Sequence, residues 1–165
     1  YHYYGVPKHA LPQKLSGIYR QRVKEPKSPL MRGFNAEFNV PVSRYTGTLR
    51  ADVEKVPELR VLAESETSGL CIVEDTALGQ VHVFNHFEYD TGTLADEYGR
   101  DVDAGRDIKV PQHYYPDEDP TKPPINTWRC HGHLLFGNWI NAMYQETPFD
   151  IAQIGADREP AETAA

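Results

Sequence analysis

The sequence predicts an α/β fold in which helices pack on a mixed β-sheet, rich in antiparallel neighbours across residues 14–87. Two observations support this prediction. Three β-rich runs, LRVLAESE, GLCIVED and GQVHVFNHF, are separated only by the turns TSG and TALG, and such short turns favour antiparallel pairing. Two later segments, residues 91–104 and 127–146, have the features of helices.

The segments before residue 50 are predicted to be mostly extended. Residues 1–5 are predicted to end a helix, because Gly5 and Pro7 are typical of a helix C terminus. The run KLSGIYRQRV predicts a strand, and KEPKSPLMRGF, with its prolines and glycine, predicts a connection. A short extended segment, FNVPVSRYTGTL, follows, with Pro41 at a sheet edge or a bend.

The run GQVHVFNHF is followed by a predicted helix and a long loop. The helix over residues 91–104 takes Asp90 or Thr91 as its N-cap and ends at Gly105. Residues 107–126 are rich in proline and carry an acidic triplet, so they predict a long irregular surface loop.

The helix over residues 127–146 has the clearest periodicity in the chain. Asn126 or Thr127 is predicted to cap it, and Pro148 to stop it. The apolar residues at helical spacing are predicted to be buried against the sheet: Trp128, Leu135 and Trp139.

Composition excludes several classes of protein. A length of 165 residues with 39% hydrophobic and 25% charged residues suits one domain or a large part of one. The net charge of −7 and the lack of a basic block argue against a nucleic-acid partner. No apolar run approaches the ~20 residues of a membrane span. Two widely spaced cysteines, Cys71 and Cys130, argue against a disulfide framework and favour the cytoplasm.

The ends of the sequence predict part of a longer chain. The sequence starts without Met on an aromatic cluster, YHYY, which resembles the tail of an interrupted helix, and it lacks the features of a signal peptide. Residues 1–151 are therefore expected to form the C-terminal portion of one domain. Residues 152–165 are small and polar, and a disordered tail is expected there.

The apolar run before residue 88 ends in two titratable residues, His86 and Glu88. In an extended segment, residues i and i+2 point to the same side, so the two side chains can meet at the strand end. A carboxylate beside an imidazole fixes its tautomer and stabilises the imidazolium, as a general base requires. The alternative is structural: the histidine caps a loop, and the glutamate favours the N terminus of the following helix.

No nucleophile or metal site stands out beside this pair. Cys71 lies in an apolar strand, where a thiol is inert. Cys130 and His131 are helix neighbours whose side chains are expected to diverge. His131 and His133 are two residues apart, which is the wrong spacing for joint chelation on a helix, so no metal site is predicted.

Four stretches resemble a known enzyme family: QKLSGIYRQ, LMRGFNAEFNVPVSRY, FNHFEYDTGTLADEYGRDVDAG and WRCHGHLLFGNWINAMYQETPFDI. They are similar to the C-terminal half of the homoserine O-acyltransferases of the methionine pathway, the succinyl- and acetyl-transferring family. The similarity runs from the first residue to about Ile151. It implies the C-terminal part of a class I glutamine-amidotransferase-like, flavodoxin-like α/β domain.

The resemblance also implies site residues. In that family a cysteine accepts the acyl group from acyl-CoA and passes it to the homoserine hydroxyl, and a His-x-Glu pair completes the triad. His86 and Glu88 match the pair, although Phe87 stands where the family usually has Pro, and Phe84-Asn85 stand where it usually has Thr-Gly. The nucleophile has no counterpart in residues 1–165 and is expected just before Tyr1. The matching substrate-binding positions are Lys14, Ser43 and Arg100.

The predicted function is part of an acyltransferase that moves an acetyl or succinyl group from acyl-CoA to L-homoserine. Acyl-CoA is a co-substrate, and no cofactor is expected. The expected partners are these substrates, the missing N-terminal half of the domain and, by association of exposed apolar surface, a second copy. The chain alone is expected to be inactive. Two alternatives remain open: a glutamine-amidotransferase-like hydrolase, and a non-catalytic binding or assembly module.

Overall fold

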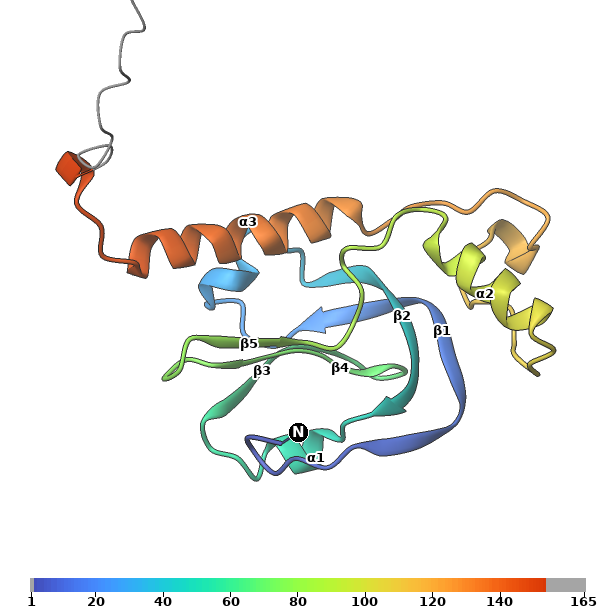
Figure 1. Ribbon diagram of the computed structural model, residues 1–165, viewed down its shortest axis with the longest axis horizontal. Helices are drawn as coiled ribbons and strands as arrows, with labels where there is room; N and C mark the ends of the chain where they lie inside the picture. The colour runs from blue at the N-terminus through green and yellow to red at the C-terminus, as the bar shows by residue number, and fades with distance from the viewer. Residues whose placement is uncertain (1, 154–165) are drawn as a thin grey trace, which may run out of the picture.

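The computed structural model describes residues 2–153, whose strands form one antiparallel sheet in the order β2-β1-β3-β4-β5 (Figure 1). The predicted antiparallel neighbours are confirmed, but the sheet is antiparallel throughout rather than mixed. Parallel pairing among the described residues is limited to one isolated bridge between Gly17 and Gln112. The strands are β1 (His9–Val23), β2 (Glu37–Gly47), β3 (Leu59–Ser65), β4 (Gly69–Asp75) and β5 (Gln80–Val83).

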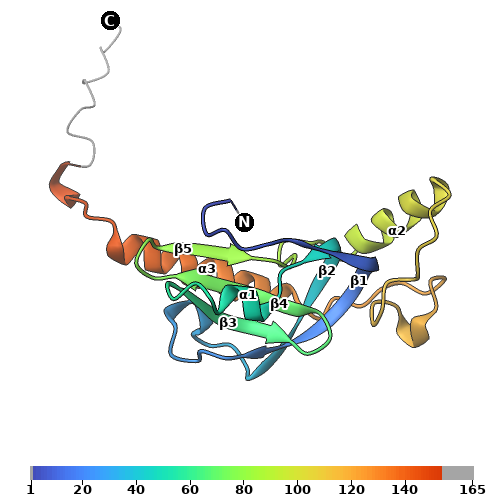
Figure 2. The ribbon, with the colours of Figure 1, turned by 90° about the horizontal axis from the view of Figure 1, so that it is seen from below.

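Strands β1 and β2 form a long curved pair at one side of the sheet. Their ladder runs from His9 and Gly47 to Arg22 and Glu37, with a register shift after Ala10. Strand β1 joins β3 only through its last two residues, so the rest of the pair curves away from the other strands (Figures 1 and 2). Strand β2 is a sheet edge, which confirms the predicted position of Pro41, a residue without a backbone N–H to pair.

Both predicted helices are present. Helix α2 follows β5, and helix α3 lies along one side of the sheet (Figure 1). The cap of α2 is Gly92 rather than Asp90 or Thr91. The N-cap of α3 is Trp128 rather than Asn126 or Thr127. The side-chain oxygen of Asn126 nevertheless accepts from the backbone N–H groups of Trp128 and Arg129 at 3.2 and 2.9 Å. The helices are α1 (Arg50–Val53), α2 (Thr93–Asp103) and α3 (Arg129–Glu146), with 3-10 turns η1 (Pro29–Met31), η2 (Pro116–Glu118) and η3 (Ile151–Gln153).

The predicted helix end before residue 6 is wrong, and one short helix was missed. Residues 2–5 form a turn instead of a helix end, although Gly5 does take the positive φ of 64° that a helix stop would need. The short helix α1 was not predicted, because four residues are too few to show periodicity. The predicted tail of residues 152–165 lies, from residue 154 on, outside the described residues.

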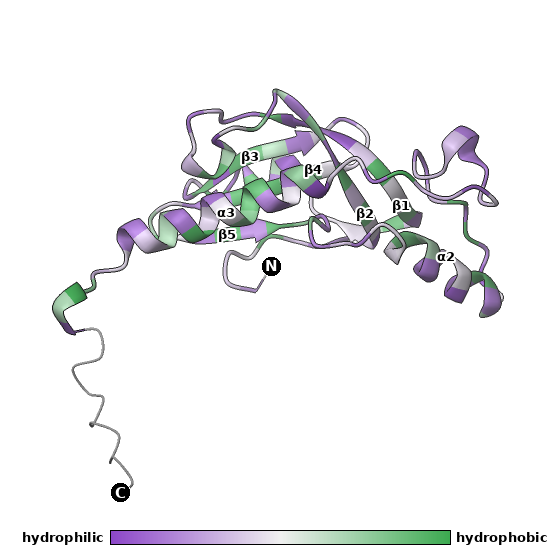
Figure 3. Cartoon of the chain, turned by 90° about the horizontal axis from the view of Figure 1, so that it is seen from above, coloured by the Kyte–Doolittle hydropathy of each residue, from purple (hydrophilic) through white to green (hydrophobic). Residues whose placement is uncertain are grey.

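The predicted burial of helix α3 holds for its start only. Trp128 and Leu135 are buried, as predicted, but Trp139 is 43% exposed. The buried residues of α3, Gly132 and Leu135, lie in its first two turns, so the apolar periodicity continues beyond the part of the helix that is buried. Green and purple segments alternate along α3 in Figure 3.

The segment over residues 107–126 is more than a surface loop. Tyr114 and Tyr115 are buried in a cluster with Ile18, Leu94 and Trp128. The segment crosses β1 at Gly17, where a Cβ atom would clash with the backbone of Gln112. The prediction of a surface loop was wrong for Tyr114 and Tyr115. It was based on the proline content of the segment and gave no weight to these two aromatic residues.

Helix α3 approaches the turn after β5 closely at Gly132. A Cβ atom on Gly132 would lie 2.6 Å from the carbonyl oxygen of Phe87. Phe87 itself is buried and packs on Phe38, with ring centroids 5.9 Å apart. The close approach of helix and turn therefore depends on the absence of a side chain at position 132. No helix of the described residues is long and apolar enough to cross a membrane.

Replacing Gly132 with Ala is expected to lower the free energy of unfolding by about 1–3 kcal/mol, because the helix must move away from the Phe87 carbonyl. Gly137→Ala is the matched control on the same helix: a Cβ atom there meets nothing within 4 Å. It should stabilise the protein by about 0.5–1 kcal/mol through the better helix propensity of Ala. Urea unfolding measures both, and equal stability of the two variants would contradict the close contact.

Candidate active site

The turn that carries His86 and Glu88 leaves the sheet earlier than predicted. Strand β5 ends at Val83, so the two residues lie in a turn and not at a strand end. Phe84 N–H still bonds the carbonyl of Cys71 on β4 at 2.9 Å, whereas His86 N–H bonds the carbonyl of Pro41 on β2, also at 2.9 Å. The backbone hydrogen bonds of this turn therefore change from β4 at Phe84 to the edge strand β2 at His86.

His86 and Glu88 meet directly. Nδ1 of His86 lies 2.8 Å from Oε1 of Glu88, and the two side chains are 32% and 57% exposed. With Nδ1 held by a carboxylate, Nε2 is the ring nitrogen left to exchange a proton with another group. The structure therefore brings the predicted pair together, through the turn rather than through the alternation of a strand.

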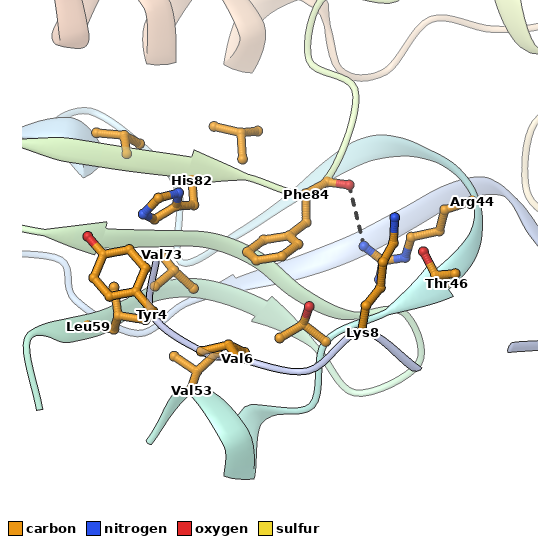
Figure 4. A pocket seen from close by; sticks show the side chains of 13 residues that line it. Tyr4, Val6, Lys8, Arg44, Thr46, Val53, Leu59, Val73, His82 and Phe84 are labelled. Atoms are coloured by element: carbon orange, nitrogen blue, oxygen red, sulfur yellow. Dashed lines mark hydrogen bonds between the residues drawn. The ribbon is translucent and has the colours of Figure 1, made fainter. Parts of the chain in front are cut away.

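Side chains from two directions hold this turn. Arg44 on β2 donates to the carbonyl of Phe84 at 3.4 Å (dashed in Figure 4) and to the side-chain oxygen of Asn85 at 3.2 Å. From the opposite end, the indole N–H of Trp128 donates to the carbonyl of Tyr89 at 2.9 Å. The backbone around the His-Glu pair is thus fixed before and after it.

A polar cluster on β1, β2 and α2 adjoins the pair. The ring of Tyr89 stacks on the His86 imidazole, with centroids 4.2 Å apart and planes at 20°. The Tyr89 hydroxyl donates to Oε1 of Glu97 at 2.6 Å, and the Ser43 hydroxyl donates to Oε2 of the same carboxylate. The ammonium group of Lys14 lies 3.6 Å from that Oε2.

The environment of Glu97 keeps it ionised. Burial by itself would raise the pKa of this carboxyl, but the hydrogen bonds from Ser43 and Tyr89 and the charge of Lys14 lower the pKa below its usual value. Burial and the bond to Glu97 raise the pKa of the Tyr89 phenol far above its usual range. Tyr89 is therefore a protonated donor, and Glu97 is a charged acceptor.

Lys14 belongs to a nearly buried ion pair. Its ammonium group donates to Oδ2 of Asp101 at 2.6 Å, and the two side chains are 8% and 2% exposed. Arg106 bonds the other oxygen of Asp101 at 2.8 Å. The hydrogen bond from Lys14 lowers the pKa of Asp101. Arg100, the remaining predicted substrate residue, is exposed on α2. Its positive charge opposes the rise in the pKa of Tyr89 and adds to the fall in the pKa of Asp101.

Sequence reasoning missed Tyr89, Glu97 and Asp101, which connect the predicted residues to each other. One signal was present: Glu97 and Asp101 are four residues apart in a predicted helix, which places both on one face. Their contact with Lys14 and Ser43 joins segments that lie far apart along the chain, and no local pattern reports it.

The two cysteines of the chain lie in different environments. Cys71 is fully buried in β4, and burial raises its pKa to about 12. Cys130 is exposed at the start of α3, with Sγ 3.6 Å from Nδ1 of His131, so these neighbours meet instead of diverging. In the described residues no three His, Cys, Asp or Glu side chains are arranged to hold a metal ion.

A cavity of about 490 Å³ lies behind the turn, between the N-terminal segment, α1 and the last two strands (Figure 4). Valine, leucine and phenylalanine side chains dominate its walls, and Arg44 forms part of one end. None of the five predicted site residues lines it. Two of its lining residues, Arg44 and Phe84, are joined by the hydrogen bond that helps to hold the turn before His86.

Comparison with known proteins identifies the family. A family model described as homoserine O-succinyltransferase matches residues 1–149. The chain belongs to this family. A relative from Cereibacter sphaeroides, named homoserine O-acetyltransferase, is 53% identical over 155 residues, which cover 94% of this chain and 51% of the relative. A relative of the same name from Rhizobium rhizogenes is 52% identical over 158 residues, which cover 96% of this chain and 51% of the relative.

The chain spans about half the length of the curated relatives it matches. A solved structure from Thermoplasma acidophilum, described as part of a GMP synthase, aligns with a TM-score of 0.51 at 14% identity. The alignment covers 86% of this chain and 51% of that one. This likeness concerns the fold alone, and it confirms the predicted glutamine-amidotransferase-like α/β class.

The Lys14 cluster predicts a loss of stability in acid. The folded-state pKa values of Glu97 and Asp101 are depressed from their ordinary values of 4.5 and 3.8. Stability from these groups is therefore complete above the unfolded-state pKa and is lost as the pH falls through the lower folded-state values. In Lys14→Met the depression shrinks, so the free energy of unfolding should fall less between about pH 6 and about pH 3 than in the parent chain.

Lys122→Met is the matched control, because it removes an ion pair with Asp117 in which the side chains are 42% and 81% exposed. Such a pair contributes about 0–1 kcal/mol, so its removal should leave the pH dependence nearly unchanged. Urea unfolding at both pH values gives the comparison. Parallel pH dependences of Lys14→Met and the parent would contradict the coupling of Lys14 to the two carboxylates.

Proposed function

We propose that this chain supplies the general base and the acceptor side of a homoserine O-acyltransferase site. The observation that carries the proposal is the His86–Glu88 contact of 2.8 Å, partly open to solvent, beside the cluster of Ser43, Glu97 and Lys14. Family membership supplies the reaction class. The third member of the triad is a cysteine outside residues 1–165.

The reaction is a two-step acyl transfer. In the first step the cysteine gives its proton to Nε2 of His86, the thiolate attacks the thioester carbonyl of acyl-CoA, and CoA leaves with a proton. In the second step His86 takes the proton of the homoserine hydroxyl, whose oxygen attacks the enzyme thioester and releases O-acylhomoserine and the thiol. Glu88 holds Nδ1–H and stabilises the imidazolium in both steps.

The acceptor site is proposed to lie over Ser43, Lys14 and Arg100. Homoserine carries a carboxylate and an ammonium group, and the guanidinium of Arg100 offers the planar pair of donors that suits a carboxylate. The Ser43 hydroxyl already donates to Glu97, so its oxygen is left to accept from the substrate. Lys14 is held by Asp101 and Glu97 and can offer a remaining N–H.

Acetyl-CoA is the proposed donor, because both relatives quoted above are named homoserine O-acetyltransferases. Succinyl-CoA is the competitor to be measured beside it, since the family description names that group. The acyl-CoA is a co-substrate, and the proposed chemistry uses no metal or prosthetic group. The cytoplasm, where acyl-CoA and amino acids meet, is the proposed location.

His86→Ala in the intact enzyme that contains this chain should lower kcat/KM by about 10²- to 10⁴-fold, which is the usual contribution of a general base. His113→Ala is the matched control, because it removes another histidine–carboxylate contact, in which Nδ1 lies 3.3 Å from Oε1 of Glu118. Release of CoA from acetyl-CoA with homoserine measures the rate, and melting temperatures check folding. Near-parent turnover by His86→Ala would refute the assignment.

Residues 1–165 alone are expected to give no turnover, because Cys71 is buried with a raised pKa and no other cysteine matches the family's nucleophile. Mass spectrometry of the intact enzyme mixed with acetyl-CoA should show one acetyl group on a cysteine. Normal turnover by the isolated chain would contradict the proposed triad. Glutamine hydrolysis without acyl transfer would favour a hydrolase, and the lack of any acylated intermediate would favour a binding module.

A further inference from the structure

Tyr89 touches the proposed base directly. Its ring lies nearly parallel to the His86 imidazole, with centroids 4.2 Å apart and planes at 20°. The two residues also share the turn backbone, in which Tyr89 N–H approaches the carbonyl of His86 at 3.5 Å. A stacked ring on one face limits rotation of the imidazole about its bond to Cβ. It therefore favours the orientation in which Nδ1 faces Glu88.

Tyr89 is itself fixed at both ends. The indole of Trp128, a fully buried residue, donates to its carbonyl at 2.9 Å. Its hydroxyl donates to Glu97 at 2.6 Å, and Glu97 in turn is held by Ser43 and Lys14. The ring that stacks on His86 is thus tied to the helix α3 boundary on one side and to the acceptor cluster on the other.

The stack also suits the charge that develops during the proposed reaction. His86 becomes a cation each time it accepts a proton. A cation over the face of an aromatic ring within about 6 Å is attracted by the ring quadrupole. The contact is therefore stronger in the protonated state than in the resting state, and such a difference affects kcat more than KM.

We propose that Tyr89 is a positioning residue for His86: its ring orients the imidazole and stabilises the imidazolium, and its bond to Glu97 holds that ring in place. This inference rests on the proposed function for the role of His86. The substrate-side cluster and the base are thereby joined by one side chain.

Two kinds of variant separate the ring from the hydroxyl. Tyr89→Phe keeps the stack and loses the bond to Glu97, so kcat should fall by about 2- to 5-fold. Tyr89→Leu and Tyr89→Met lose the ring, and kcat should fall by about 10- to 100-fold with KM within about twofold of the parent. Two ring-less variants are used so that one that fails to fold can be replaced by the other. Tyr144→Leu, on an exposed tyrosine of α3, is the control.

A second readout does not depend on activity. In proton NMR the ring current of the stacked Tyr89 should shift the His86 ring protons upfield, and these signals can be assigned by their loss in His86→Asn. They should move downfield in Tyr89→Leu and Tyr89→Met and stay near the parent positions in Tyr89→Phe.

The outcomes distinguish the two proposals. An active His86→Ala enzyme would sink the proposed function. An inactive His86→Ala enzyme combined with parent kcat in the folded ring-less variants would overturn the role of Tyr89 alone. Unchanged His86 signals in those variants would also overturn it, and a loss confined to KM would assign Tyr89 to substrate binding instead.

Discussion

The hydrogen bond from the His86 N–H to the carbonyl of Pro41 is the constraint on which the site depends. Strand β2 is a sheet edge, and its proline has no N–H to pair, but its carbonyl is available to the turn that follows β5. Two residues further along β2 stands Ser43. The same short piece of edge strand therefore positions the proposed base and one end of the polar cluster.

Helix packing secures this arrangement from the other side. Gly132 allows α3 to approach the Phe87 carbonyl, and Trp128 bonds the carbonyl of Tyr89. Phe87, which stands between His86 and Glu88, is buried and packs on Phe38. Its side chain anchors the turn in the core, while the residues on either side of it turn their polar groups outward.

Electrostatics explain why so many charges can sit close to one another. Lys14 is almost fully buried, and a buried ammonium group would be costly without partners. Asp101 and Glu97 supply those partners, and Arg106 balances the second oxygen of Asp101. Lys14 and its two carboxylate partners are therefore paired with one another, and this cluster adjoins the proposed base through Tyr89.

The alternation and short turns of the central runs were sufficient to predict β3, β4 and β5, because antiparallel neighbours joined by tight turns are a local property. The same local reasoning extended β5 to Phe87 and buried Trp139. Alternation and periodicity continue in a sequence after the partner strand or the core has ended, so they cannot mark where packing stops.

The residue types of the site were likewise visible: the His-x-Glu spacing and the resemblance singled out His86, Glu88, Lys14, Ser43 and Arg100. What the sequence by itself determined is therefore which chemical groups are present and which elements carry them, since these depend on neighbours in the chain. Only the tertiary structure decided that Tyr89 stacks on His86 and that Glu97 joins Ser43 to Lys14. Such contacts are made between distant segments, and their geometry exists only once β1, β2, α2 and the turn have packed together.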